Sequence, residues 1–423
     1  MQRTAPETAI FAAGLVLPVS APPIRDGALL VENGRIASIG PLSEIGHDNP
    51  NVEVRYFPRY AIVPGAVNAH AHLGFRRGDE PEGGSFSRWM TELIARLPEK
   101  AAWTPEAARN SAREAIESGT TFMAESSLYG ECLPALAESG LAGRVYAEFL
   151  PFEFGSPEEA VRTIEERVLT LREGLPPRVG VEVSVHAPYT VDPESARLAA
   201  QRVRERGERL ATHLSESPEE YEFVSEGTGF LADIFARLVQ VEWDGMGVSP
   251  VRYAENLGLL WPGTIAAHLA TGVSEEDVEI LARTGVAAAH CPRSNEYLGC
   301  GVSPVPEMLA RGVRVGMGTD GLWSSPSMNL FEETLFAANL HGFDGETALM
   351  LATLGGARAL GIEGETGSLK VGKWADFAVV EALPGEPGRS PEMEVLEAAA
   401  GGGVAATVVG GAPVYNRLED GVG

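Results

Sequence analysis

The chain has 423 residues, 44% hydrophobic and 22% charged, which predicts either one large α/β barrel with additions or two to three domains and excludes a disordered chain. Its formal net charge of −26 excludes nucleic acid as a partner, because phosphate binding requires a basic surface, and favours a small-molecule ligand. Three cysteines, an odd number, argue against a disulfide framework and for a cytoplasmic location, and no stretch reaches the roughly 20 apolar residues of a membrane span.

Both ends of the chain consist of short β-like runs separated by turn residues. Residues 1–60 contain AIFAAGLVLPV, GALLVE, RIASIG and VEVRYF, with Asn33-Gly34 as a turn signal. Residues 361–423 contain two similar runs, WADFAVVEAL and GVAATVVGGAPVYN. These β-rich ends around a long middle predict one small β-sandwich domain, built from residues 1–60 and 361–423.

Residues 61–360 alternate between apolar runs and helix-like segments. Eight runs resemble parallel strands buried on both faces, at 61–68, 120–126, 144–150, 180–185, 209–214, 264–269, 285–290 and 314–320. Helix-like segments lie between most of them, at 104–118, 156–174, 192–207 and 274–285. This alternation predicts an α/β fold with a (β/α)8 TIM barrel over 61–360 as the catalytic domain. The competing doubly wound sheet would have a glycine-rich phosphate loop after its first strand, where this chain has HAH.

Six of the eight histidines and one aspartate fall at the ends of predicted strands. They are His70, His72, His186, His213, His268, His290 and Asp320, while His47 and His341 lie elsewhere. In a TIM barrel the C-terminal ends of the strands surround one mouth, where active sites lie. We therefore expect side chains that are about 250 positions apart to share one site.

The motif HAH at 70–72 predicts a metal site, because residues i and i+2 of a strand point to the same side. His213 and Asp320 would complete a set of three imidazoles and one carboxylate with an open position for water, as catalytic zinc requires. A bound metal lowers the pKa of its water from about 15.7 to about 7, so hydrolysis is the expected chemistry. The alternative for His213 and His268, each taken singly, is a hydrogen-bonded core histidine.

Glu216 follows His213 by three residues in HLSESPEE, so the same loop would present it beside the bound water as a proton carrier. The alternative is a solvated residue at a helix start, because the following Ser217-Pro218-Glu219-Glu220 is a good cap. We expect Asp320 both to bind the metal and to accept the first proton, and His268 to act as a neutral hydrogen-bond partner.

The segments PGAVNAHAHL, THLSE, AAHL, HCPRSN and GTDG follow one another in this order along the chain. With GSLKVGKWADFAVV near the C-terminus, they make the chain similar to the amidohydrolase superfamily, in its cytosine deaminase and chlorohydrolase-like branch. That branch includes adenosine, methylthioadenosine and S-adenosylhomocysteine deaminases. The resemblance implies metal ligands and acid–base groups at these positions: His70, His72, His213 and Asp320 for the metal, Glu216 and His268 for proton transfer.

The resemblance also bears on the number of metals. Two-metal members of the superfamily carry a carboxylated lysine at the end of strand four, whereas this chain has VSVHAPYT there and no lysine between 101 and 369. We therefore expect one divalent metal, zinc, with iron or nickel as alternatives because this ligand set accepts all three. In the deaminase branch the histidine that matches His186 contacts the substrate. The alternative is a structural histidine against Pro188 and Tyr189.

The resemblance implies deamination of an adenine-type nucleoside. SFSRWM at 85–90 is similar to deaminases of nucleosides with large substituents, so Phe86 and Trp89 are expected at the substrate, with helix packing as the alternative. The favoured substrate is 6-amino-6-deoxyfutalosine of menaquinone biosynthesis, whose carboxylate needs a local cation. Arg88 and Arg293 are candidates for this cation, unless they are only solvated or paired.

Several alternatives stay open from the sequence. They are a deaminase of adenosine, methylthioadenosine or S-adenosylhomocysteine, a chlorohydrolase of a triazine-like ring, and a catalytically silent metal-binding barrel. The aromatic-rich residues 217–262 predict either a substrate lid or a packed insertion. A homodimer is compatible with the sequence, which does not determine the oligomeric state.

Overall fold

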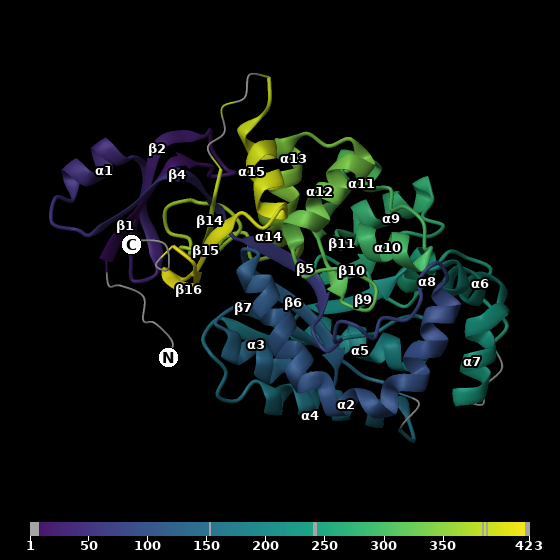
Figure 1. The fold of residues 1–423 in the computed structure, drawn as a ribbon. Helices are drawn as coiled ribbons and strands as arrows, with labels where there is room; N and C mark the ends of the chain where they lie inside the picture. The colour runs from purple at the N-terminus through teal and green to yellow at the C-terminus, as the bar shows by residue number, and fades with distance from the viewer. Residues whose placement is uncertain (1–7, 152–153, 240–242, 383–384, 386–387, 419–423) are drawn as a thin grey trace.

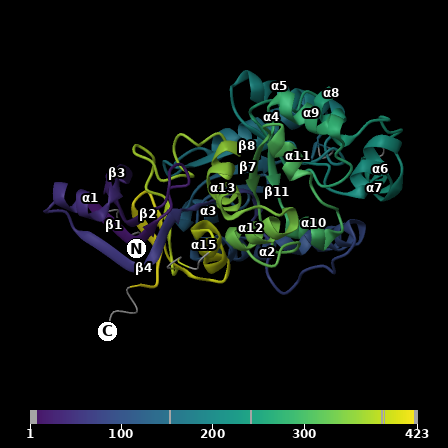
Figure 2. The same cartoon turned by 90° about the horizontal axis from the view of Figure 1, so that it is seen from above.

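The structure is a computed structural model that describes residues 8–151, 154–239, 243–382, 385 and 388–418. It consists of a parallel barrel and a mixed sheet at one side of it (Figures 1 and 2). In Figure 1 the purple N-terminal strands and the yellow C-terminal strands lie together in this mixed sheet, beside the blue, teal and green barrel. No helix within the described ranges is both long and apolar enough to cross a membrane.

Eight parallel strands form the barrel wall, each hydrogen-bonded to the next along the chain. They are β5 (Ala66–His72), β6 (Thr120–Leu128), β7 (Ala142–Glu148), β8 (Val179–Ser184), β9 (Leu210–Leu214), β10 (Thr264–His268), β11 (Ala287–His290) and β12 (Arg314–Met317). The short strand β13 (Asp320–Gly321) follows β12 and pairs with β5, which closes the ring. The predicted barrel is confirmed, and its strand ends meet at one mouth.

Helices follow the strands and cover the barrel. They are α2 (Phe86–Glu117), α3 (Leu133–Ser139), α4 (Pro157–Leu171), α5 (Pro193–Glu205), α6 (Pro218–Glu226), α7 (Gly229–Val239), α8 (Pro250–Asn256), α9 (Glu275–Thr284), α10 (Pro292–Leu298), α11 (Val305–Ala310), α12 (Leu330–His341), α13 (Gly345–Met350), the π-helix η2 (Leu351–Gly355) and α14 (Gly356–Ala359). The helices α4, α5, α6 and α8 begin after a Ser or Asp whose side chain accepts a backbone N–H, with proline in the first turn.

One of these helices is longer than the sequence pattern predicts. The segment 104–118, which we expected to begin at Thr104-Pro105, is only the second half of α2. Pro98 and Pro105 lie inside this helix although proline lacks a backbone N–H, and the Thr104 hydroxyl donates to the Lys100 carbonyl 2.9 Å away. The extra N-terminal half of α2 lies along the mouth of the barrel and contributes side chains to the substrate cavity.

The ends of the chain form one seven-stranded mixed sheet in the order β16-β15-β14-β4-β1-β2-β3. The strands are β1 (Thr8–Val16), β2 (Ile24–Glu32), β3 (Arg35–Pro41), β4 (Val54–Pro64), β14 (Phe377–Val380), β15 (Val404–Val409) and β16 (Ala412–Asn416), with short helices α1 (Leu42–Asp48) and α15 (Pro391–Ala400). An edge-to-face contact of Phe11 and Phe377, with ring centroids 5.0 Å apart, joins the two ends in the core of the sheet. We predicted a small β-sandwich from both termini; the structure confirms that the two ends join in one β-sheet unit, a seven-stranded mixed sheet, while its bounds at 1–60 and 361–423 stay a prediction.

The predicted strand 61–68 is divided between the two parts of the molecule. Residues up to Pro64 belong to β4 of the mixed sheet, and β5 of the barrel begins at Ala66. Gly65 lies between them, where a Cβ atom would stand 2.2 Å from the hydroxyl of Thr121, so only glycine fits. The chain therefore passes from the mixed sheet into the barrel at this glycine, and β5 ends in the HAH motif.

Candidate metal centre and substrate cavity

The last residues of β5 bring His70 and His72 together at the barrel mouth, with ring centroids 4.8 Å apart. The pairing of β5 with β6 is irregular between Asn68 and Ala71, and such bulges re-aim side chains at barrel rims. The Asn68 side-chain amide donates to the Thr319 hydroxyl at 2.8 Å, which ties β5 to the residue before Asp320. The two histidines of the motif thus lie close together.

A facing pair of imidazole nitrogens indicates a cation. The Nε2 atoms of His72 and His213 lie 3.1 Å apart. On the far sides of the rings, His72 Nδ1 lies 2.7 Å from the Ser126 carbonyl and His213 Nδ1 lies 3.0 Å from the His186 carbonyl. Because a carbonyl only accepts, both Nδ1 atoms carry the proton, and two bare Nε2 lone pairs face each other. A metal ion between them removes this repulsion.

Asp320 supplies the carboxylate of the site. Its Oδ1 atom lies 3.7 Å from His70 Nε2 and 3.5 Å from His72 Nε2, and its Oδ2 atom accepts from Ser294 at 2.5 Å and from Ser324 at 2.7 Å. Burial raises the pKa of Asp320, but His72 and the two serines outweigh it, so the pKa is lower than usual. His70 Nε2 is buried without a hydrogen-bond partner among the described residues, as expected of an atom reserved for a metal.

His268 lies in the same cluster. Its Nδ1 atom is 3.0 Å from the Asn295 side-chain oxygen, while its Nε2 atom is buried, lacks a partner among the described residues and lies 3.6 Å from Glu216 Oε1. Its ring centroid is 5.5 Å from that of His70. Five residues therefore make up one metal site: His70, His72, His213, His268 and Asp320.

The histidines of this site are neutral, which is the form that binds metal. Burial lowers the pKa of His72 to about 4, although Asp320 acts in the opposite direction. Burial also lowers the pKa of His70 well below its usual value, and the neighbouring histidines lower it further.

Left-handed backbone at non-glycine residues clusters around the site. His268 has φ 70°, Asp320 has φ 60° and Ser215 has φ 51°. The amides of Ser215 and Glu216 donate to the buried Glu220 carboxylate at 2.8 and 2.7 Å. Such strained positions persist where the surrounding contacts over-determine them, so the loop after His213 is held firmly in place.

Glu216 is buried beside the histidine cluster. Burial raises the pKa of Glu216 to about 7, although His213 lowers it in part, and the Tyr189 hydroxyl donates to Oε2 at 3.3 Å. The cap of α6 is Ser217, whose hydroxyl accepts from the Glu220 amide at 3.1 Å. The Glu216 carboxyl group is therefore free of the capping role that we considered and points to the cavity.

Two further groups line the cavity next to His213. His186 follows β8, contacts Thr190 through Nδ1 at 2.7 Å, and has its ring centroid 4.8 Å from that of His213. Glu148, the last residue of β7, has its Oε1 atom 3.8 Å from His213 Nδ1 and without a hydrogen-bond partner among the described residues. We did not predict Glu148, although its position at the end of a predicted strand was a usable signal.

The site opens into a cavity of about 590 Å³. At one end lie His72, His213, Glu216 and Asp320. One wall is apolar and comes from helices α2 and α7, through Trp89, Leu93, Leu97, Leu231 and Ile234. Lys100, also from α2, and Glu131 line the same cavity, and we did not predict either. A cavity of this size accommodates a nucleoside with a substituent.

Of the predicted substrate-binding residues Phe86, Trp89, Arg88 and Arg293, only Trp89 is among the described residues that line the cavity. Trp89 lines the cavity and donates from Nε1 to the Trp323 carbonyl at 3.1 Å. Phe86 is buried and packs on Trp89 with ring centroids 6.0 Å apart, outside the lining of the cavity. Arg88 and Arg293 also lie outside that lining. Arg88 is exposed and paired with Glu82, and Arg293 is paired with Glu332 at 3.0 Å.

Residues 217–262 contain α6, α7 and α8. The Phe223 and Trp243 rings stack with centroids 5.1 Å apart, and Trp243 is 5.9 Å from Tyr253. These aromatic rings pack on one another, while α7 adds the aliphatic Leu231 and Ile234 to the cavity. The described part of this segment thus contributes to the cavity lining, and both interpretations, a substrate lid and a packed insertion, stay predictions.

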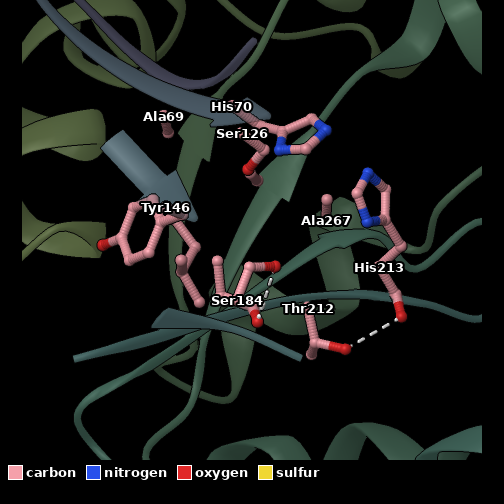
Figure 3. A pocket seen from close by; sticks show the side chains of 11 residues that line it. Ala69, His70, Ser126, Tyr146, Ser184, Thr212, His213 and Ala267 are labelled. Carbon is pink, nitrogen blue, oxygen red and sulfur yellow. Dashed lines mark hydrogen bonds between the residues drawn. The ribbon is translucent and has the colours of Figure 1, made fainter. Parts of the chain in front are cut away.

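A second, much smaller pocket of about 10 Å³ lies inside the barrel, beneath the metal site. Figure 3 shows the rings of His70 and His213 next to each other at its rim, with the hydroxyl groups of Ser126, Ser184 and Thr212 around it. Its volume corresponds to about one water molecule.

Known proteins are similar to this chain in sequence over most of its length. The chain is 32% identical over 376 residues to 5-methylthioadenosine/S-adenosylhomocysteine deaminase of Syntrophobacter fumaroxidans, which covers 84% of this chain and 80% of the relative. It is 31% identical over 428 residues to the deaminase of the same name from Moorella thermoacetica, covering 96% of this chain and 93% of the relative.

Solved structures agree on the fold. The adenosine deaminase of Xanthomonas campestris with bound zinc is 26% identical, has a TM-score of 0.81, and covers 99% of this chain and 95% of its own. The aminofutalosine deaminase of Helicobacter pylori in complex with methylthio-coformycin has a TM-score of 0.85 and covers 96% of this chain and 99% of its own. At 22% identity, the second likeness concerns the fold alone. Residues 61–414, which contain the whole metal site, match the amidohydrolase family, and the chain belongs to that family.

Proposed function

We propose that this protein is a mononuclear metal-dependent deaminase of adenine nucleosides with a 5′ substituent, as in methylthioadenosine or S-adenosylhomocysteine. The observation that carries the proposal is the buried Glu216 carboxyl group beside the histidine cluster, with a pKa of about 7. A group with this pKa can donate a proton at neutral pH and take one up again. Hydrolytic deamination needs such a proton donor at the ring nitrogen and a proton for the departing ammonia, whereas a halide leaves as an anion, so Glu216 favours deamination without excluding halide displacement.

The metal ligands that we propose are His70, His72, His213 and Asp320, and the metal is zinc, as in the similar adenosine deaminase structure. The facing Nε2 atoms of His72 and His213 and the orphaned Nε2 of His70 fit a divalent ion. When bound, the metal lowers the pKa of a water molecule toward neutrality. A single ion is expected because His186 stands where a two-metal site would need a carboxylated lysine.

The protein side chains then move protons around the substrate. Asp320 accepts the proton of the water, and Glu216 transfers a proton to the ring nitrogen next to the carbon that bears the amino group. Asp320 then passes its proton to the amino group, which leaves as ammonia, while the hydroxyl proton of the adduct returns to Glu216 and a keto base remains. His268, 3.6 Å from Glu216 and held by Asn295, orients the attacking oxygen through Nε2.

Support for the 5′ substituent comes from the relatives and from the cavity. Relatives that cover more than 80% of this chain are named 5-methylthioadenosine/S-adenosylhomocysteine deaminase. Our first expectation, 6-amino-6-deoxyfutalosine, requires a cation for its carboxylate, but Arg88 and Arg293 lie outside the cavity lining, and Lys100, which does line the cavity, is paired with Glu131. We therefore place this nucleoside second.

Ammonia release from a panel of compounds tests the proposal. The purified protein, loaded with zinc and checked by elemental analysis, is assayed with methylthioadenosine, S-adenosylhomocysteine, adenosine, 6-amino-6-deoxyfutalosine and a chlorinated triazine. We expect ammonia from the first two compounds with the highest kcat/KM. Chloride release without ammonia would instead identify a chlorohydrolase, and a metal-loaded protein that turns over none of them would be a silent metal-binding barrel.

A further inference from the structure

An ion pair lies on the cavity wall, outside the metal site. Lys100 in the middle of α2 contacts Glu131 in the turn between β6 and α3, and both side chains line the cavity. The Lys100 side chain is 14% exposed and that of Glu131 is 30% exposed, so a ligand in the cavity can reach both. The Lys100 ammonium also lies 5.1 Å from the centre of the Phe75 ring, which holds it at the wall.

Lys100 is the one lysine or arginine among the described residues that line this cavity. Two further carboxyl groups lie near it, Glu125 in β6 and Glu148 at the end of β7, and the Lys100 charge lowers the pKa of both against the larger effect of burial. Burial raises the pKa of Glu125 to about 7 and that of Glu148 well above its usual value, so neither carries a full negative charge at neutral pH, and Glu131 is the ion-pair partner of Lys100.

The other cavity-lining side chains of α2 and α7 are mostly apolar. Trp89, Leu93 and Leu97 of α2 and Leu231 and Ile234 of α7 present apolar surface to the cavity. A substituent that extends from a bound nucleoside therefore meets aliphatic and aromatic side chains and a single ion pair, Lys100–Glu131.

We infer that the Lys100–Glu131 pair is a subsite for a zwitterionic 5′ substituent, one that carries an ammonium and a carboxylate on neighbouring atoms, as an α-amino acid does. The inference rests on the proposed function, because it assigns the 5′ end of the same nucleoside. An α-amino acid offers its carboxylate to Lys100 and its ammonium to Glu131, so each charge of the protein gains a partner and none is left unpaired.

The same geometry ranks other substituents. An apolar group such as methylthio leaves the Lys100–Glu131 contact intact and packs on the apolar side chains of the cavity, so it is accepted at no electrostatic cost. A substituent with only a carboxylate takes Lys100 away from Glu131 and leaves that carboxylate unpaired next to the incoming anion. The subsite therefore separates S-adenosylhomocysteine from a carboxylate-bearing nucleoside such as 6-amino-6-deoxyfutalosine.

The test compares Lys100→Met, Glu131→Gln and the double variant with the wild-type protein, all loaded with zinc. Arg162→Met in α4 is the matched control, because Arg162 is also paired with a glutamate, Glu166, but lies outside the cavity lining. The kcat/KM is measured for S-adenosylhomocysteine and for methylthioadenosine. The Kd is measured by calorimetry for the deaminated products, S-inosylhomocysteine and methylthioinosine, which undergo no turnover.

We expect each single variant to lower kcat/KM for S-adenosylhomocysteine about tenfold, at the lower end of the range for charged hydrogen bonds because the pair is partly exposed. The Kd for S-inosylhomocysteine should rise by a similar factor, while the methylthio compounds and the Arg162→Met protein change by no more than about twofold. The subsite would be overturned if the variants lost kcat/KM equally for S-adenosylhomocysteine and methylthioadenosine. It would also be overturned if they lost none for S-adenosylhomocysteine. If no nucleoside is deaminated, the proposed function fails, and the product Kd values still decide whether the pair binds the zwitterion.

Discussion

Two histidines end neighbouring barrel strands in the same register, yet they face opposite ways. His268 ends β10 and His290 ends β11, and the residues before them, Ala267 and Ala289, pair with each other and line the small pocket inside the barrel. Alternation along a strand would turn both histidines outward. His290 does face outward, where its Nε2 lies 3.1 Å from that of His341 in α12, whereas His268 belongs to the metal site.

The backbone explains the difference. His268 has φ 70°, in the left-handed region, and this turns its side chain across the end of the strand, while His290 is not among the residues with positive φ. Asp320, with φ 60°, reaches the site in the same way. A non-glycine residue in this region costs about 1–3 kcal/mol, which the surrounding contacts must offset. A strand-end position thus brings a side chain near the mouth, and the backbone of that residue decides whether it reaches the metal.

Substitution of Glu216, the residue that His268 faces, should have the largest effect on kcat. Glu216→Gln keeps the shape of the side chain but removes the transferable proton, so we expect kcat to fall about 10³-fold, or about 4 kcal/mol, with the metal content unchanged. Steady-state kinetics and elemental analysis measure the two quantities, and Glu222→Gln in α6 is the control. A Glu216→Gln protein with normal kcat would remove the carboxyl group from the mechanism.

Substitutions of the two histidines, His268 and His290, should affect kcat differently. His268→Ala should lower kcat about 10²-fold, or about 2.7 kcal/mol, because an orienting group at the reacting atoms is lost. His290→Ala should leave the kcat of the folded fraction within about threefold, since its side chain is on the far side of the strand. Circular dichroism of each variant gives the folded fraction. Similar losses of kcat in both would show that the opposite orientations have no functional meaning.

The fold and the metal site followed from local patterns in the sequence. Short apolar runs that alternate with capped helices predicted the barrel, and the HAH motif with Asp320 predicted the metal site because strand ends in a barrel converge. The sequence pattern did not distinguish His290 from His268, because side-chain direction at a strand end depends on one backbone angle. The sequence pattern also assigned residues 61–64 to the first barrel strand, whereas they belong to the mixed sheet. The apolar run continues through Gly65, so the pattern does not show that one strand ends and the next begins there.

The substrate side of the cavity was less predictable. Arg88 was expected there because of its charge, yet it pairs with the nearby Glu82 at the surface. Lys100 and Glu131, which do line the cavity, come from a helix and a turn whose packing no local pattern reveals. Ligands held by strand geometry could be predicted, whereas contacts made by the covering helices depend on tertiary packing.

The outward-facing histidine should make stability depend on pH. Burial, with smaller contributions from His341 and His268, lowers the pKa of His290 to about 3, so the folded protein keeps it neutral while the unfolded chain protonates it below about 6.5. Stability is therefore lost as the pH falls below 6.5, by about 2 kcal/mol at pH 5. Urea unfolding at pH 7 and pH 5 should show this extra loss in the wild-type protein and not in His290→Gln. An equal loss in both would mean that His290 is already protonated in the folded state.

The smallest effect should come from substitution of Asn295, the residue that holds the His268 ring toward the metal site. The Asn295 side-chain oxygen lies 3.0 Å from His268 Nδ1 and fixes both the tautomer and the ring, with Nε2 free toward Glu216. Asn295→Ala should lower kcat about tenfold, or about 1.4 kcal/mol, as is common for groups that orient residues of a metal site. Asn295→Asp, which keeps the acceptor, should recover most of the loss, and Asn110→Ala on the exposed face of α2 should have no effect on kcat. If Asn295→Ala kept the wild-type kcat, the left-handed backbone alone would suffice to position His268.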